Sequence, residues 1–174
     1  LVTNPAGAPQ HPLATTSVGP ELRALIEVAK PGSLTNAVLV DAYAACEREQ
    51  AALQARKAAL LVEMARRVGA MPGVGTGPDQ IPVEKVIALE LACAVHLTCD
   101  GAEDELAFAL SLHQLAVTRD ALAAGMLSVA KARAIALACV GMTTQQREAI
   151  EARIFPRALT QTPTQLSPCL RRAV

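Results

Sequence analysis

The chain has 174 residues, a formal net charge of zero, and 52% apolar residues of which few are aromatic. This apolar fraction excludes intrinsic disorder, and the length suits a single domain. Thirty-five residues are alanine, the best helix former and a residue depleted in strands, so an all-β fold is nearly excluded and an all-α fold is expected. A zero net charge gives no global case for binding nucleic acid or an acidic membrane.

The sequence carries no targeting or membrane-spanning signal. No uncharged apolar run reaches the roughly 18 residues of a membrane helix, so no membrane partner is expected. Residues 1–18 lack the basic start and apolar block of a signal peptide and, without any periodicity, predict a flexible leader. Five cysteines favour free thiols in a reducing cytoplasm. The start at Leu1 and the stop at Val174 predict a piece of a longer protein.

Residues 19–68 predict a short helix followed by a long helical arm. The short helix is expected over 20–30, where Pro31-Gly32 ends it. Ser33 or Thr35 then caps a helix that runs to about Val68. At 1.5 Å per residue this helix is about 50 Å long, longer than a small domain is wide.

A heptad stripe on the long helix gives the candidate dimerisation residues. They are Leu39, Cys46, Leu53 and Leu60. The helix either packs along its own domain or serves as a coiled-coil-like arm in a homodimer. Polar Glu49, Arg56 and Glu63 occupy the second seam position, which weakens the coiled-coil interpretation.

The remaining chain predicts a loop over 69–81, rich in Gly and Pro, and a helical bundle over 82–174. Pro82 opens the first bundle helix, Gly125 and Pro156 act as stops, and no strand is expected. Residues 19–174 are expected to form one domain, truncated at the C-terminus. The expected bundle helices are 82–95, about 99–117, 119–124, 129–139, 144–155 and one from 163 onward.

Residues 90–106 have the spacing of a helix-turn-helix, with a turn at 96–98 and a second helix capped by Thr98. Small Ala92 and Ala102 permit a close helix crossing. The residues expected to fill the wedge between the helices are Val95, Leu97 and Leu106. In DNA-binding versions the start of the second helix enters the major groove, but residues 100–105 carry four carboxylates here. Because phosphates repel them, we expect a helix-turn-helix-like hairpin that does not insert into DNA.

The zero net charge is a sum of unequal parts. Residues 1–78 carry +1, residues 79–120 carry −6, and residues 121–174 carry +5. The basic last third either binds phosphates or pairs internally with the acidic middle. The candidate nucleic-acid-binding residues are Lys131, Arg133, Arg153, Arg157, Arg171 and Arg172.

No catalytic constellation is visible, and we expect no catalytic residue, no metal and no cofactor in this chain. Cys93, His96 and Cys99 have helical spacing, but the paired knuckles of a zinc site are absent. The acidic residues of 100–105 lack the ligand spacing of a cation-binding loop and predict a solvated helix start. Phosphate-loop and nucleophile-elbow motifs are absent. Three histidines do not assemble a His-Asn-His nuclease.

Three stretches together resemble the 13E12 repeat family, which carries the domain of unknown function 222. Residues 90–98 read Glu-Leu-Ala-Cys-Ala-Val-His-Leu-Thr, and residues 122–135 read Leu-Ala-Ala-Gly-Met-Leu-Ser-Val-Ala-Lys-Ala-Arg-Ala-Ile. Residues 150–158 read Ile-Glu-Ala-Arg-Ile-Phe-Pro-Arg-Ala, followed by Thr-Pro-Thr-Gln-Leu and Leu-Arg-Arg-Ala-Val. The resemblance covers about residues 35–174. Lys131 stands where the family has His, and the acidic 103–105 where the family often has Arg.

The resemblance implies a helical domain without an established activity of its own. Many members of that family continue into a C-terminal His-Asn-His endonuclease domain, and some lie near mobile elements. The expected function is therefore a non-catalytic domain that positions or regulates such a nuclease on DNA. The expected partners are DNA, the nuclease domain and a second copy of the chain. The alternative is a dimerisation or protein-interaction module that binds no nucleic acid.

Overall fold

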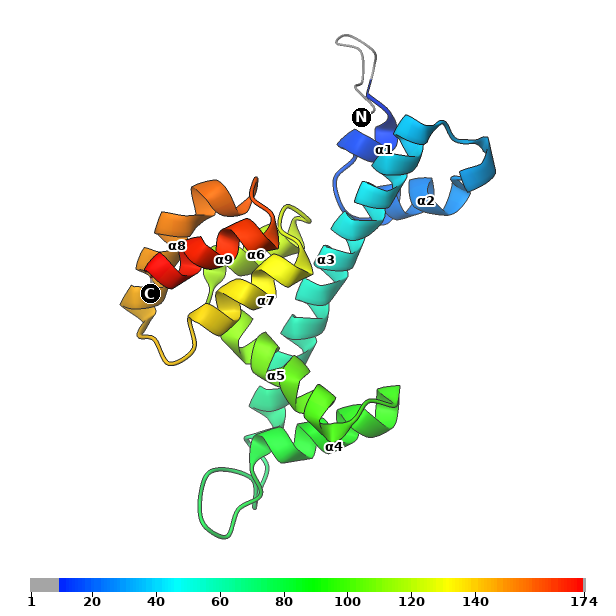
Figure 1. Cartoon of the computed structure of the whole chain (residues 1–174). Helices are drawn as coiled ribbons and strands as arrows, with labels where there is room; N and C mark the ends of the chain where they lie inside the picture. Colours follow the sequence, from blue (N-terminus) through cyan, green and yellow to red (C-terminus); the bar gives the residue numbers. More distant parts are fainter. Residues whose placement is uncertain (1–9, 174) are drawn as a thin grey trace.

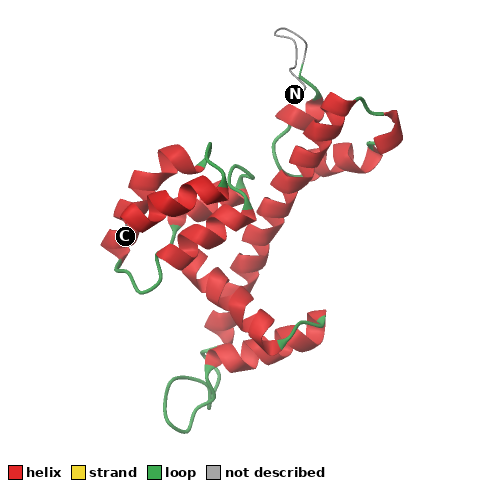
Figure 2. Ribbon diagram, viewed as in Figure 1, coloured by secondary structure: helices red, strands yellow, loops and turns green. Residues whose placement is uncertain are grey.

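The computed structural model describes residues 10–173, which form nine α-helices and no extended strand. An isolated bridge joins Val74 and Ile81 in the loop after the long helix. The all-α prediction is confirmed: a long helix is followed by a compact helical bundle (Figures 1 and 2). The helices are α1 (Pro12–Thr15), α2 (Pro20–Val28), α3 (Asn36–Val68), α4 (Val83–Val95), α5 (Cys99–His113), α6 (Ala116–Ala123), α7 (Val129–Ala138), α8 (Thr144–Ala158) and α9 (Pro163–Ala173).

Helix α3 is the axis of the molecule. Thr35 caps it, since its hydroxyl oxygen accepts a hydrogen bond from the Val38 amide at 3.4 Å. Figure 1 shows α1 and α2 beside its N-terminal end, α4 and α5 crossing its C-terminal end, and α6–α9 stacked on one side. The predicted long arm is therefore present, and the domain is built around it.

Alanines of α3 form the contact with the bundle. Ala51, Ala55 and Ala58 are buried in the same core as Leu106 and Leu112 of α5. Because an alanine side chain is a single methyl group, it lets two helix backbones approach closely and keeps good helix propensity. The main core also contains leucines and isoleucines from α6 to α9.

A second, smaller core fixes the N-terminal part of the chain. Leu13 of α1 and Leu22 of α2 are buried together with Ala45 of α3. The Arg48 guanidinium donates to the Leu13 carbonyl at 2.6 Å. The predicted flexible leader over 1–18 is wrong for residues 12–15, which form a docked helix, and residues 1–9 lie outside the described part. The single apolar residue Leu13 carries this docking, and it has no periodic neighbours to signal it.

Three helix boundaries differ from the predictions by at least three residues, and one of them is the start of α6, which lies at Ala116 and not at residue 119. The helix expected over 99–117 ends at His113, because the extended Leu115 (φ −118°, ψ 83°) turns its side chain into the core. The α8 helix continues past Pro156 to Ala158. A proline in a last turn removes a single backbone hydrogen bond, and the burial of Ile154 and Ala158 on either side offsets this loss.

The α4–α5 hairpin has the predicted turn but not the predicted wedge. His96 ends α4 in the left-handed region (φ 56°), and the Thr98 hydroxyl accepts from the Gly101 amide at 3.1 Å to start α5. Leu106 is buried, but Val95 and Leu97 are 53% and 43% exposed. The end of the hairpin projects away from α3 (Figure 1), and Val95 and Leu97 near this end remain partly in solvent.

Some charged side chains form hydrogen bonds with the backbone at the end of a neighbouring helix. Helix α6 has no side-chain cap of its own, and the buried Glu151 of α8 accepts from the Thr118 amide and hydroxyl, both at 2.7 Å. The buried Glu49 of α3 accepts from the Gly19 amide at 2.5 Å and pairs with Arg23 at 3.0 Å. These bonds satisfy amides that a helix leaves open at its N-terminus, where a negative charge is favoured.

Replacing the buried carboxylate of α8 tests this capping directly. Glu151→Ala leaves the Thr118 amide and hydroxyl without their acceptor inside the core, so unfolding should need about 2–3 kcal/mol less. Urea denaturation followed by circular dichroism measures the change. Glu148→Ala, on the exposed face of the same helix, is the matched control with a change within about 0.5 kcal/mol. Equal stability of the two variants would contradict the capping role.

Candidate nucleic-acid interface

Helices α8 and α9 present four of the six candidate arginines and lysines to solvent. A reciprocal capping box of Thr143 and Gln146 starts α8. Ile150 and Ile154 of α8 and Leu166 of α9 are buried between the helices and the bundle, which leaves the outer faces of both helices open. We name these exposed residues the α8–α9 basic surface: Arg153, Arg157, Arg171 and Arg172.

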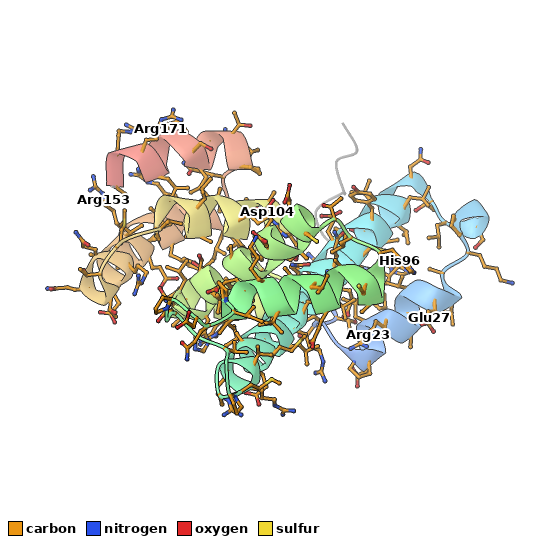
Figure 3. The ribbon with its side chains drawn as sticks, turned by 90° about the horizontal axis from the view of Figure 1, so that it is seen from below. Arg23, Glu27, His96, Asp104, Arg153 and Arg171 are labelled. Atoms are coloured by element: carbon orange, nitrogen blue, oxygen red, sulfur yellow. The ribbon has the colours of Figure 1, made fainter. Side chains whose placement is uncertain are left out.

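The two helices bring their arginines to one end of the molecule. Arg153 of α8 and Ala173 of α9 line the same groove of about 190 Å³, so the outer face of α8 meets the last turn of α9. Figure 3 shows Arg153 and Arg171 at the same extremity, opposite Glu27 of α2. Arg153 and Arg157 are four residues apart and therefore share one face of α8.

Lys131 is half-buried on α7 and does not belong to this surface. Its ammonium group donates to the carbonyl of Ala158 at 2.8 Å and to that of Leu159 at 3.5 Å. These carbonyls belong to the open C-terminal end of α8, where a positive charge is favoured. Partial burial lowers the pKa of Lys131 from its usual range. Two of the three donors of the Lys131 ammonium group therefore bind backbone carbonyls, which disfavours the phosphate contact that the sequence predicted for this residue.

Arg133 is also engaged internally. It forms an ion pair with Glu105 of α5, and its guanidinium lies 4.4 Å from the centre of the Phe108 ring. Gln54 of α3 donates to the same carboxylate at 2.9 Å. Arg133 thus links α7 to α5, and through Glu105 to α3. Internal pairing between the basic last third and the acidic middle of the chain is one of the two alternatives that the sequence leaves open. The Arg133–Glu105 ion pair is an example of such pairing.

The α8–α9 basic surface escapes that neutralisation. Within residues 10–173, no carboxylate lies within ion-pair distance of its four arginines. Arg172 donates to the backbone carbonyl of Pro168 at 3.1 Å, which holds its side chain along α9. Alone among the exposed residues of the two helices, Glu148 is acidic. The surface therefore keeps a positive local charge in a protein of zero net charge.

The start of α5 remains acidic, as the sequence predicted. Glu103 pairs with Lys85 at 2.7 Å, and this hydrogen bond raises the pKa of Lys85. Asp100 and Asp104 are exposed. In the described residues no group of three His, Cys, Asp or Glu side chains is arranged to hold a metal ion. The carboxylates at the start of α5 therefore disfavour phosphate contacts by this hairpin.

The candidate dimerisation residues share one open face of α3. Leu39, Leu53 and Leu60 are 37%, 48% and 59% exposed, and Cys46 is exposed between them. Tyr43, which is 71% exposed, extends this face. Sequence reasoning missed it although it lies four residues after Leu39. We name these five residues the α3 stripe.

Comparisons of the chain with models of protein families, with curated proteins and with solved structures find no match. The resemblance to the 13E12 repeat family therefore rests on the motifs quoted above. No described helix combines the length and apolar character that crossing a bilayer requires. The five cysteines are free thiols, and Cys139 is buried, which raises its pKa.

Protein stability can distinguish the candidate basic residues that are bound within the fold from those that are exposed. Lys131→Met removes the donor from the end of α8 and should lower the free energy of unfolding by about 1–2 kcal/mol. Arg153→Ala removes an exposed side chain and should change it by less than about 0.5 kcal/mol. Urea denaturation of both variants distinguishes them. A Lys131 variant as stable as the unmodified chain would return Lys131 to the exposed set.

Proposed function

We propose that this chain is a non-catalytic helical domain that contacts the phosphate backbone of DNA through the α8–α9 basic surface. A single observation carries the proposal: four arginines lie exposed on two adjacent helices with no carboxylate partner among the described residues. Arginine suits this task, because its planar guanidinium donates to phosphate oxygens in pairs and stays charged.

The expected binding is modest and sequence-independent. Four phosphate contacts release about four counterions, so the logarithm of affinity should fall with the logarithm of salt at a slope of about −3 to −4. Phosphate contacts position a protein on the duplex but carry no base readout. The acidic start of α5 makes groove reading by that helix unfavourable, which agrees with a positioning role.

The identity of the positioned partner comes from the family resemblance. Members of the 13E12 repeat family often carry a C-terminal His-Asn-His endonuclease domain. The proposed DNA contact would therefore position such a nuclease domain of the same protein on its DNA. Such a protein would act in the cytoplasm, a location that its free thiols support. The alternative function, a dimerisation module, is favoured by the exposed α3 stripe. The two are compatible because they use different helices.

Titration of a fluorescent 30-base-pair duplex at several salt concentrations tests the proposal. Arg153→Ala combined with Arg171→Ala should weaken binding at every sequence and reduce the salt slope by about 2. Arg66→Ala combined with Arg67→Ala is the matched control, since it removes the same charge from the far end of α3. This control should leave affinity unchanged.

Two results would overturn the DNA role. One is the absence of binding by the unmodified chain at low salt. The other is an equal loss of affinity in both double variants, because it would show dependence on net charge and not on the α8–α9 basic surface.

A further inference from the structure

We propose that two copies of this chain pair through their α3 stripes in antiparallel orientation. The stripe runs from Leu39 to Leu60, about 32 Å along the helix at 1.5 Å per residue. Single exposed apolar residues are normal on a protein surface, whereas several large apolar side chains gathered on one helix face mark an interaction site. The stripe lies on a different face of α3 from the buried Ala51, Ala55 and Ala58, and only Leu53 among its described residues lines the edge of a cleft between α3 and α6.

The charges beside the stripe identify the occupant and its direction. Beside the stripe, the exposed Glu47 in its N-terminal half is acidic, and the exposed Lys57 in its C-terminal half is basic. Within residues 10–173 neither of these two residues forms an ion pair. A helix face that is acidic in its N-terminal half and basic in its C-terminal half is complementary in charge to the same face of a second copy in antiparallel orientation. A parallel copy would instead place Glu47 beside Glu47 and Lys57 beside Lys57.

The heptad spacing fixes one register for the reversed copy. With the two-fold axis between residues 51 and 52, Tyr43 faces Leu60 of the second copy and Gln50 faces Leu53. Leu39 lies opposite Met64, which is half-buried against the main core of its own copy. Cys46 then faces the aliphatic stem of Lys57, whose ammonium group can reach Glu47 of the second copy. The pairs at the two ends of the interface are apolar, and the pairs near the two-fold axis contain Gln50 and Lys57. Polar residues at these positions favour one register but lower the affinity of the dimer.

Sedimentation equilibrium of the whole chain without DNA tests pairing independently of the proposed DNA contact. Between about 10 µM and about 500 µM the mass should rise from monomer to dimer. Leu60→Glu should weaken the dimer at least about ten-fold, because it places a charge against Tyr43. Leu137→Glu on α7, at a leucine that is 77% exposed and lies outside the stripe, is the control and should dimerise normally. A chain that stays monomeric, or an unaffected Leu60 variant, overturns the proposal.

Charge reversal tests the complementarity. Glu47→Lys and Lys57→Glu should each weaken the dimer roughly ten-fold, since each breaks two symmetry-related pairs. The double variant Glu47→Lys with Lys57→Glu restores both pairs and should recover most of the lost affinity. Additive losses in the double variant would show that these two residues do not face each other and would overturn the register.

Cross-linking tests the orientation. In a variant where Cys93, Cys99 and Cys169 are changed to serine, Cys46 is the remaining exposed thiol. A short bis-maleimide should link two copies only after Lys57→Cys is added, because Cys46 faces position 57 in the antiparallel pair. Efficient linking through Cys46 alone would show a parallel pair and would overturn the antiparallel arrangement.

Discussion

Within residues 10–173, four charged side chains bind the open ends of helices other than their own. Glu49 and Glu151 accept from amides at the N-terminal ends of α2 and α6, whereas Arg48 and Lys131 donate to carbonyls at the C-terminal ends of α1 and α8. The signs follow the helix dipole, with carboxylates at positive ends and cations at negative ends. Each contact also satisfies backbone groups that helix geometry leaves without partners.

An alanine-rich core explains why the fold depends on these contacts. Methyl groups let helices approach closely, but they interdigitate less than large side chains and therefore specify the position of a helix less sharply. Helix α6, two turns long and without a side-chain cap of its own, would have little to hold its N-terminus. A buried carboxylate with two hydrogen bonds holds that end in one position, because moving it would leave a charge unpaired in the core.

These contacts decide which charges remain for function. A sequence shows Lys131, Arg133 and Arg153 as equivalent members of a basic segment, since nothing local separates them. In the structure the first closes α8, the second pairs with Glu105 against Phe108, and the third is exposed. The positive surface is therefore smaller than the net charge of +5 suggests, and it is confined to α8 and α9.

Local signals made much of the fold predictable, and tertiary effects account for the rest. Thr98 and Ser128 were identifiable as helix caps, because a cap acts through hydrogen bonds within three residues. Pro156 was misread as a helix end, because burial of its neighbours decides whether the helix continues. The docking of Leu13 and the exposure of Val95 depend on which element lies opposite, and no local pattern encodes that.

The long helix α3 also shows that a local sequence pattern does not reveal which face of a helix becomes buried. Its apolar heptads predicted an arm with one buried face, but α3 buries its alanines and leaves the leucines of the stripe in solvent. Close helix crossings within the domain select small residues, so the large ones are free for a separate contact. In a pair joined along the α3 stripes, α6–α9 of each copy lie on the outer side of its own α3. The proposed pairing along α3 and the proposed DNA contact through α8 and α9 then use separate surfaces of the molecule.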